Sequence, residues 1–267
     1  MKSSFNVCFD AVLPANGQIV GNIAQASSQI KALIQKDGHS LLARTIQAVH
    51  ICGASRIVVV GNDDVCSEAI QNGATRCLAP GKDGAANILI GLDWLTDSPH
   101  EKHEWVMICP TDMPYLCAEK LNDFISQIPE ETDLLMPLIA KQDFESRFPH
   151  TNSTYLNLKE GVFASGGVFM VRTAAINVIK HNLSRAFSAR KSQFKLALLV
   201  GLPVIFKLVM GRLSITDIEK RIHQMTGLRG KAILNVPPEL AFDVDTSDDL
   251  AWLDAHEHMQ AEFESQC

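Results

Sequence analysis

Short apolar runs alternate with longer segments of helical periodicity along most of this chain. The runs are rich in β-branched residues and end at Gly, Asn or Pro, which is typical of buried strands. The predicted strands are 9–13, 56–60, 105–109, 133–137, 155–158, 168–171 and 241–244. The predicted helices are 41–50, 67–71, 86–96, 121–127, 174–201, 215–225 and 248–258, and 31–34 is expected to be extended. Strands that alternate with helices predict an α/β fold with a mostly parallel sheet.

We expect residues 1–267 to form a single domain with a helical insert at about 174–230. Within the insert, 196–210 (LALLVGLPVIFKLVM) is apolar apart from Lys207. This run is shorter than the about 20 apolar residues that a helix needs to span a bilayer. It is predicted to be a buried helix pair or one helix broken at Pro203. Because basic residues flank it, a weak contact with a membrane surface or a partner is the alternative.

Composition narrows the class of ligand. Hydrophobic residues make up 46% and charged residues 20% of the chain, which is typical of a globular protein. The net charge is −6 and the basic residues are scattered, so we expect no nucleic acid partner and favour small-molecule ligands. The seven cysteines have no CxxC pair or zinc-ligand spacing and are predicted to be reduced thiols. The first 17 residues lack a long apolar stretch, so a secretory signal is not expected and a cytoplasmic location is predicted.

Acidic residues stand at two places where ligands could bind. Asp112 follows the buried run 105–109, and in open α/β sheets ligands bind outside the carboxyl ends of the strands. Asp243 and Asp245 are two apart in an extended segment, so their side chains should share one face. Two carboxylates at such a short distance repel each other. A Mg²⁺ ion bound by this pair and Asp112 would offset that repulsion. As alternatives, Asp112 could form a turn, and Asp243 or Asp245 could cap the last helix.

Two segments of small residues are candidate binding loops. The first follows the first strand, where backbone N–H groups could approach phosphate oxygens and Lys31 could add a positive charge. This loop contains Ala15, Asn16 and Gly17. The second is Gly166-Gly167, where the missing side chains let a ligand or another backbone come close, or where a β-bulge forms.

Taken in order, several segments resemble the MobA-like nucleotidyltransferases. These segments are the loop after the first strand, KALIQKDGHSLLARTIQAV, RIVVVG, WVMICPTDMPYL, a mid-chain GG and AFDVDTSDDLAWL. The resemblance runs from about Phe9 to Asp254, and TDMP and FDVDT are its most specific parts. It is strongest to a bacterial branch with FPxTxxTYxxLxxG, here 148–161, and ARK in a helical insert, here 189–191. The family implies a Rossmann-like three-layer α/β/α fold.

The resemblance also implies roles for individual residues. Asp112 would bind Mg²⁺ with Asp243 or Asp245, and Lys31 would contact the nucleotide phosphates as the second catalytic residue. The segment from Gly81 to Asn87 would lie near the base or ribose, and Gly166-Gly167 would line the acceptor pocket.

The activity that the resemblance implies is transfer of a nucleoside monophosphate from a nucleoside triphosphate to a small phosphorylated or hydroxylated acceptor, with release of diphosphate. The family's first loop carries two glycines and an arginine that helps to neutralise the diphosphate, whereas here it reads LPANGQIVGN. An inactive nucleotide-binding protein is therefore one alternative. A glycosyltransferase that uses a nucleotide sugar is the other.

Overall fold

The computed structural model describes residues 7–21, 28–97, 99, 102–151, 153–189 and 201–256. Nine strands of this part form one sheet: β1 (Phe9–Pro14), β4 (Ala54–Val60), β5 (Arg76–Leu78), β6 (Trp105–Ile108), β7 (Leu134–Ala140), β8 (Tyr155–Leu158), β9 (Gly161–Ser165), β10 (Phe169–Arg172) and β11 (Gly230–Ile233). A separate hairpin pairs β2 (Gln35–Lys36) with β3 (His39–Ser40). The α-helices are α1 (Leu41–Ile51), α2 (Asp63–Gln71), α3 (Gly84–Asp97), α4 (Ala118–Ile125), α5 (Lys141–Arg147), α6 (Ile176–Ala189), α8 (Leu202–Val209), α9 (Ile215–Thr226) and α10 (Ser247–Ala255). The described part also contains the short 3₁₀ turns η1 (Lys31–Leu33), η2 (Thr173–Ala175) and η3 (Pro238–Ala241).

The large sheet has the order β5-β4-β1-β6-β10-β7-β9-β8, and β11 also pairs with β7. The first four strands are parallel to one another. Strand β10 is antiparallel to both β6 and β7, and β9 is antiparallel to both β7 and β8. Of these nine strands in the described part, therefore, only β9 and β10 run against the common direction. The prediction of an α/β fold with a mostly parallel sheet is confirmed.

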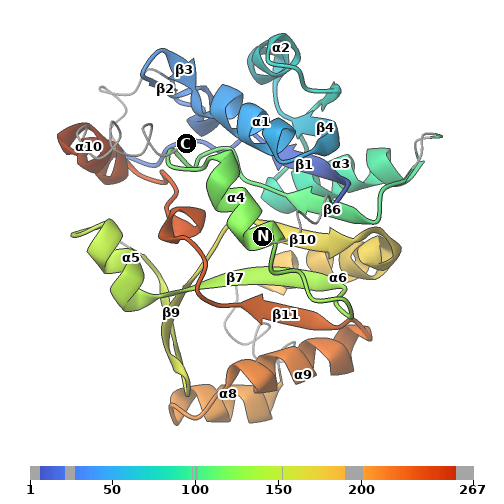
Figure 1. The fold of residues 1–267 in the computed structure, drawn as a ribbon, viewed down its shortest axis with the longest axis vertical. Coiled ribbons are helices and arrows are strands. Elements are labelled where there is room, and N and C mark those ends of the chain that lie inside the picture. Colours follow the sequence, from blue (N-terminus) through green and yellow to red (C-terminus); the bar gives the residue numbers. More distant parts are fainter. Residues whose placement is uncertain are drawn as a thin grey trace, which may run out of the picture.

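Helices cover both faces of this sheet (Figure 1). Side chains alternate between the faces along β1, so Leu13 packs in one core with α1 and α4 while Val12 packs in the other with α3. Helix α6 joins α3 on that second face through Ile176. Gly91 lets α3 lie close to β1, because a Cβ at this position would clash with a methyl carbon of Val12. The predicted three-layer arrangement is therefore confirmed.

Two local predictions were wrong. Residues 31–34 contain the 3₁₀ turn η1 rather than an extended segment. Residues 241–244 do not form the last strand, because the Val244 N–H donates to the Asp112 carbonyl (2.9 Å) and not to a neighbouring strand. The last strand is β11, which was not predicted, and α5, β5 and β9 were also missed. The final helix begins at Ser247, one residue before the predicted start. Its N-cap is Thr246, whose side chain accepts a hydrogen bond from the Asp249 N–H, so neither Asp243 nor Asp245 caps it.

The range predicted as a helical insert contains α6, α8 and α9. The prediction for 196–210 was wrong where the structure describes it, since α8 starts at Leu202-Pro203 instead of being broken there. Its outward side chains are exposed rather than buried. Residues 196–200 lie outside the described part. Among the described helices, none is both long and apolar enough to cross a membrane.

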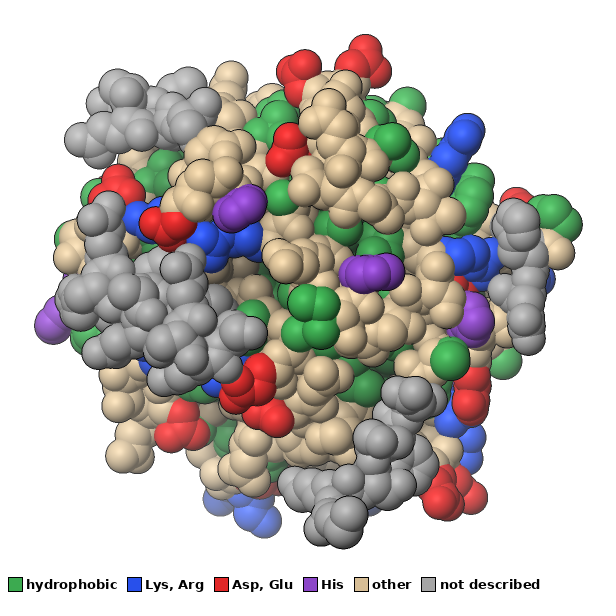
Figure 2. Space-filling model, turned by 45° about the horizontal axis from the view of Figure 1, so that its top comes forward, with side chains coloured by type: hydrophobic (Ala, Val, Ile, Leu, Met, Phe, Trp, Pro, Cys, Tyr) green, Lys and Arg blue, Asp and Glu red, His purple; other side chains and the backbone are tan. Residues whose placement is uncertain are grey.

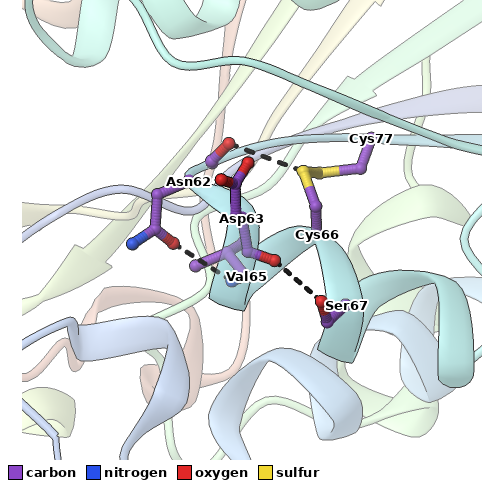
Figure 3. The surroundings of a disulfide bond; sticks show 7 residues. Asn62, Asp63, Val65, Cys66, Ser67 and Cys77 are labelled. Carbon is purple, nitrogen blue, oxygen red and sulfur yellow. Dashed lines mark hydrogen bonds between the residues drawn. A yellow bond between two sulfur atoms is a disulfide. The ribbon is translucent and has the colours of Figure 1, made fainter.

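The prediction that all the cysteines are reduced was wrong. Cys66 on α2 and Cys77 on β5 form a disulfide (Figure 3), and Cys117 is also disulfide-bonded. The spacing of 11 residues did not indicate the Cys66–Cys77 bond, because it forms only when β5 adds to β4 and brings Cys77 back beside α2. Cys8, Cys52 and Cys109 are free thiols, and the cytoplasmic location stays a prediction.

Loss of the Cys66–Cys77 bond should lower stability. The bond closes a loop of 11 residues, which removes about 3 kcal/mol of conformational entropy from the unfolded chain. We expect Cys66→Ser to lower the free energy of unfolding by about 2–3 kcal/mol in urea titrations. Free Cys8→Ser is the control, and an equal loss in that variant would contradict the explanation.

Candidate active site

The carboxyl ends of β1 and β6 bring the predicted acids together with the predicted lysine. The chain leaves β6 through Thr111 and Asp112, and the Thr111 hydroxyl donates to the Pro14 carbonyl (3.4 Å) at the end of β1. The hydrogen bond from the Val244 N–H to the Asp112 carbonyl then holds the segment 242–246 against this edge. As a result, one carboxylate oxygen from each of Asp112, Asp243 and Asp245 lies within 4.8 Å of the other two. Val244 is buried between the two exposed acids, so the predicted shared face exists.

Lys31 lies inside this acid cluster. Its Nζ donates to Oδ2 of Asp112 (3.2 Å) and forms an ion pair with Asp245. The lysine side chain is almost buried. The backbone N–H of Lys31 donates to the Gly17 carbonyl (3.0 Å). The ammonium group therefore occupies a position between two carboxylates, where a cation is favoured.

The pKa values of the cluster reflect burial and mutual repulsion. Asp243 reaches solvent, yet protein atoms surround much of its carboxyl group, and this partial burial raises its pKa to about 7, with Asp112 and Asp245 adding to the rise. Burial also raises the pKa of Asp112, although the Lys31 ammonium opposes this shift. For Lys31, burial lowers the pKa, but the two carboxylates outweigh it and leave the pKa above its ordinary value. The cluster thus carries more negative charge than a single lysine neutralises.

These residues fit a divalent cation. Three carboxylates supply the oxygen ligands that Mg²⁺ prefers, and Mg²⁺ takes its remaining ligands from water and phosphate. Oδ1 of Asp112 is buried and has no hydrogen-bond partner among the described residues, so it is a polar atom that a cation would satisfy. The metal assignment itself stays a prediction.

The loop after β1 is tied to both sides of the cluster. Ala15 is buried, and its N–H donates to the Val60 carbonyl (2.9 Å), so its N–H is not free for a phosphate. Gly17 is exposed, and its carbonyl accepts the hydrogen bond from the backbone N–H of Lys31. The Val20 N–H donates to the Asp245 carbonyl (3.1 Å). Asn16 lies half-buried between them. Of the three predicted loop residues, Asn16 and Gly17 have the exposure that a ligand needs.

Asp249, which was not among the predicted site residues, positions Asp245. Its buried Oδ2 accepts hydrogen bonds from the Asp245 N–H (3.0 Å), the Thr246 N–H (2.8 Å) and the Thr246 hydroxyl (2.9 Å). Thr246 and Asp249 form a capping box at the start of α10. The signal was present in the sequence, because Thr followed three residues later by an acid marks such a cap.

Gly81 and Asn87 lie in the loop after β5 and the first turn of α3. The buried Asn87 side chain accepts a hydrogen bond from the Gly81 N–H (2.8 Å), so the two residues shape this loop together. Because β5, β4, β1 and β6 are parallel, their carboxyl ends are at the same edge of the sheet as the acid cluster. A role near the base or ribose stays a prediction.

Gly166 and Gly167 are explained by close packing. A Cβ on Gly166 would be 2.5 Å from Cγ of Pro137 and 2.8 Å from the Leu240 carbonyl oxygen. The Gly167 N–H donates to the same Leu240 carbonyl (2.8 Å), so another backbone comes close here, as one of the predicted alternatives required. Close packing by itself explains why these two positions are glycine. Their location in an acceptor pocket stays a prediction.

Charges of both signs are scattered over the face shown in Figure 2, and the basic side chains do not gather into one field there. The absence of a nucleic acid partner stays a prediction.

The protonation of Asp243 predicts a pH dependence of stability in the metal-free protein. The folded state holds a proton on Asp243 up to about pH 7, whereas an unfolded aspartate releases it near 3.8. Between these values the folded state binds more protons, so this group's contribution to the free energy of unfolding falls as the pH rises and stays low above 7. We expect wild type in EDTA to lose more stability than Asp243→Asn between about pH 5 and about pH 8. Parallel urea titrations with equal losses would refute this.

Comparisons with known proteins identify similar chains. Residues 25–220 match the family model of the MobA-like NTP transferase domain. A solved structure of a hypothetical transferase from Thermus thermophilus has a TM-score of 0.77 at 26% identity, covering 90% of this chain and 99% of its own. No protein of curated function matches.

Two more distant structures share the fold. A 4-diphosphocytidyl-2C-methyl-D-erythritol synthase from Anaerococcus prevotii has a TM-score of 0.57 at 10% identity, covering 95% of this chain and 99% of its own. A CMP:2-keto-3-deoxy-manno-octonic acid synthetase solved with CTP has a TM-score of 0.57 at 11% identity, covering 94% of this chain and 99% of its own.

Proposed function

This chain belongs to the MobA-like NTP transferase domain family, and we propose that it transfers a nucleoside monophosphate from a nucleoside triphosphate to a small phosphorylated or hydroxylated acceptor in a Mg²⁺-dependent reaction. The observation that carries the proposal is the cluster of three carboxylates and Lys31 at the carboxyl edge of the sheet. Such a cluster suits a metal-bound triphosphate better than a neutral ligand, because phosphate oxygens supply the remaining ligands of the metal.

In the proposed reaction, an oxygen of the acceptor attacks the α-phosphorus, a new P–O bond forms, and the bond to the leaving diphosphate breaks. Mg²⁺ held by Asp112 with Asp243 or Asp245 would neutralise charge on the phosphate oxygens. Lys31 lies next to these acids and can turn its ammonium to the β- and γ-phosphates once a cation takes its place. Asp249 holds the backbone of Asp245, so the ligand geometry is set before the substrate binds.

The proposal is tested with a panel of nucleoside triphosphates and nucleotide sugars in the presence of Mg²⁺. A triphosphate that binds the folded protein should raise its melting temperature, and diphosphate should be released when a matching acceptor is added. Binding of a triphosphate without release, under every acceptor tried, would favour the inactive nucleotide-binding protein. Stabilisation by UDP- or GDP-sugars but by no triphosphate would favour the glycosyltransferase.

Removal of the Lys31 charge should separate metal binding from turnover. Lys31→Met leaves three carboxylates without their counter-ion, so we expect the affinity for Mn²⁺ without nucleotide to rise about fivefold, the equivalent of an ion pair worth about 1 kcal/mol. Diphosphate release should fall, because the phosphates lose a positive charge.

Isothermal titration of Mn²⁺ measures the first effect. Lys36→Met is the matched control, since Lys36 is a buried lysine that pairs with Asp254 (3.6 Å) outside the cluster. If Mn²⁺ binding is unchanged in Lys31→Met, the ammonium does not occupy the cation position.

A further inference from the structure

Helix α8 presents an apolar face to solvent. Phe206 is 68% exposed, Val209 79% and Met210 50%, and Leu208 between them is also exposed. Single exposed apolar side chains are ordinary on protein surfaces, but four within five consecutive residues are not. Figure 1 shows α8 and α9 at the end of the molecule opposite α1 and α2, so this face is far from those helices.

The inward side of α8 is anchored, so the outward face has a defined direction. Val204 packs against a small core formed by Leu138, Leu158, Phe163 and Leu213. Phe206, Val209 and Met210 are three and four residues apart, as are Pro203 and Phe206, which places them on one side of the helix, whereas Leu208 is four residues from the inward Val204. Lys207 is on the same side, four residues from Pro203.

Basic residues surround this apolar face. Lys207, Lys220 and Arg221 line one hollow between α8 and α9 together with Asp217, to which Lys207 is paired (2.6 Å). Arg212 is exposed just after the helix. Residues 201–231 contain six Lys or Arg and two Asp or Glu, whereas the whole chain has a net charge of −6. Arg229 and Lys231 are paired with Glu131, Asp133 and Glu219, so the basic side chains beside α8 are Lys207, Arg212, Lys220 and Arg221.

We propose that α8 and these basic side chains attach the protein to a bilayer that contains anionic phospholipid. A short helix with an apolar side and flanking lysine and arginine lies in the plane of the interface, with its apolar side chains below the headgroups. Eight residues of helix are about 12 Å long, so one side of α8 by itself offers far less than the about 800 Å² per partner that a stable protein interface buries. An anionic surface also complements the local charge, because each nearby lysine or arginine strengthens binding about fivefold.

Flotation with lipid vesicles tests the proposal and does not depend on the proposed activity. We expect the full chain to float with vesicles of phosphatidylcholine and phosphatidylglycerol, and to float far less with phosphatidylcholine alone. High salt should release it, because the lipid charge is then screened. Phe206→Glu should lower partitioning at least about tenfold, since it replaces buried apolar area with a charge that the surface repels. Lys220→Gln should lower it about fivefold.

Ile51→Glu is the matched control, because Ile51 is 62% exposed at the end of α1, away from α8. Its partitioning should equal that of wild type. Circular dichroism checks that Phe206→Glu is folded, and the smaller change Val209→Ser replaces it if it is not. Equal binding to neutral vesicles, or no loss in the α8 variants, would overturn the proposal. A dimer that Phe206→Glu dissociates, with no vesicle binding, would overturn it in favour of self-association.

Discussion

Asp112→Asn is expected to lower the rate of Mg²⁺-dependent diphosphate release by about 10²–10³-fold or more, while the protein stays folded. The side chain is only 18% exposed, one oxygen contacts Lys31, and the other is buried without a partner among the described residues. Asparagine has nearly the same shape but lacks the charge that a cation needs. Removing that charge also relieves repulsion with Asp243 and Asp245, so the melting temperature in EDTA should not fall.

The matched control is Asp248→Asn, an exposed acid in the first turn of α10 that is not part of the three-carboxylate cluster. Both variants are compared in diphosphate release and in the shift of melting temperature that Mg²⁺ causes with a triphosphate. Turnover that survives in Asp112→Asn would exclude this residue as the metal ligand. A similar loss in Asp248→Asn would point to a general charge effect.

Phe148→Ala should lower the free energy of unfolding by about 3–5 kcal/mol. Phe148 is completely buried, and its ring stacks on Phe242 with centroids 4.6 Å apart. The same ring contacts Tyr115 (5.3 Å) and Trp252 (5.9 Å). The alanine variant leaves a cavity directly under the segment that carries Asp243 and Asp245, so Mn²⁺ affinity should fall as well.

Urea titration measures the loss of stability. Phe206→Ala is the control, because that ring is exposed and its removal should change stability by less than about 0.5 kcal/mol. If Phe148→Ala lowers stability but leaves Mn²⁺ affinity unchanged, the aromatic cluster does not hold the acid segment in place.

Much of the fold could be predicted because its signals are local. The runs at 57–60 and 105–109 are continuous and apolar since both faces of those strands are covered. The shared face of Asp243 and Asp245 follows from the alternation of an extended chain. The prediction of a strand at 241–244 was wrong because side chains alternate in any extended segment. This segment is extended but bonds to the Asp112 loop instead of joining the sheet.

Distant contacts could not be predicted from the chain alone. The Cys66–Cys77 bond depends on β5 joining β4, and the position of the Lys31 ammonium between Asp112 and Asp245 depends on residues separated by 81 and 214 positions. The exposure of α8 was also predicted wrongly, since an apolar sequence indicates burial but does not show whether another element covers it.

By itself, the sequence determined the α/β class, the family resemblance and the identity of the acids and the lysine, because these depend on residue type and on spacing within a few turns or strands. Only the tertiary structure decided that the acids meet around Lys31, that Asp249 holds Asp245, and that α8 faces solvent. The physical reason is that periodicity specifies which face of an element is apolar, whereas the packing of the whole chain specifies what that face meets.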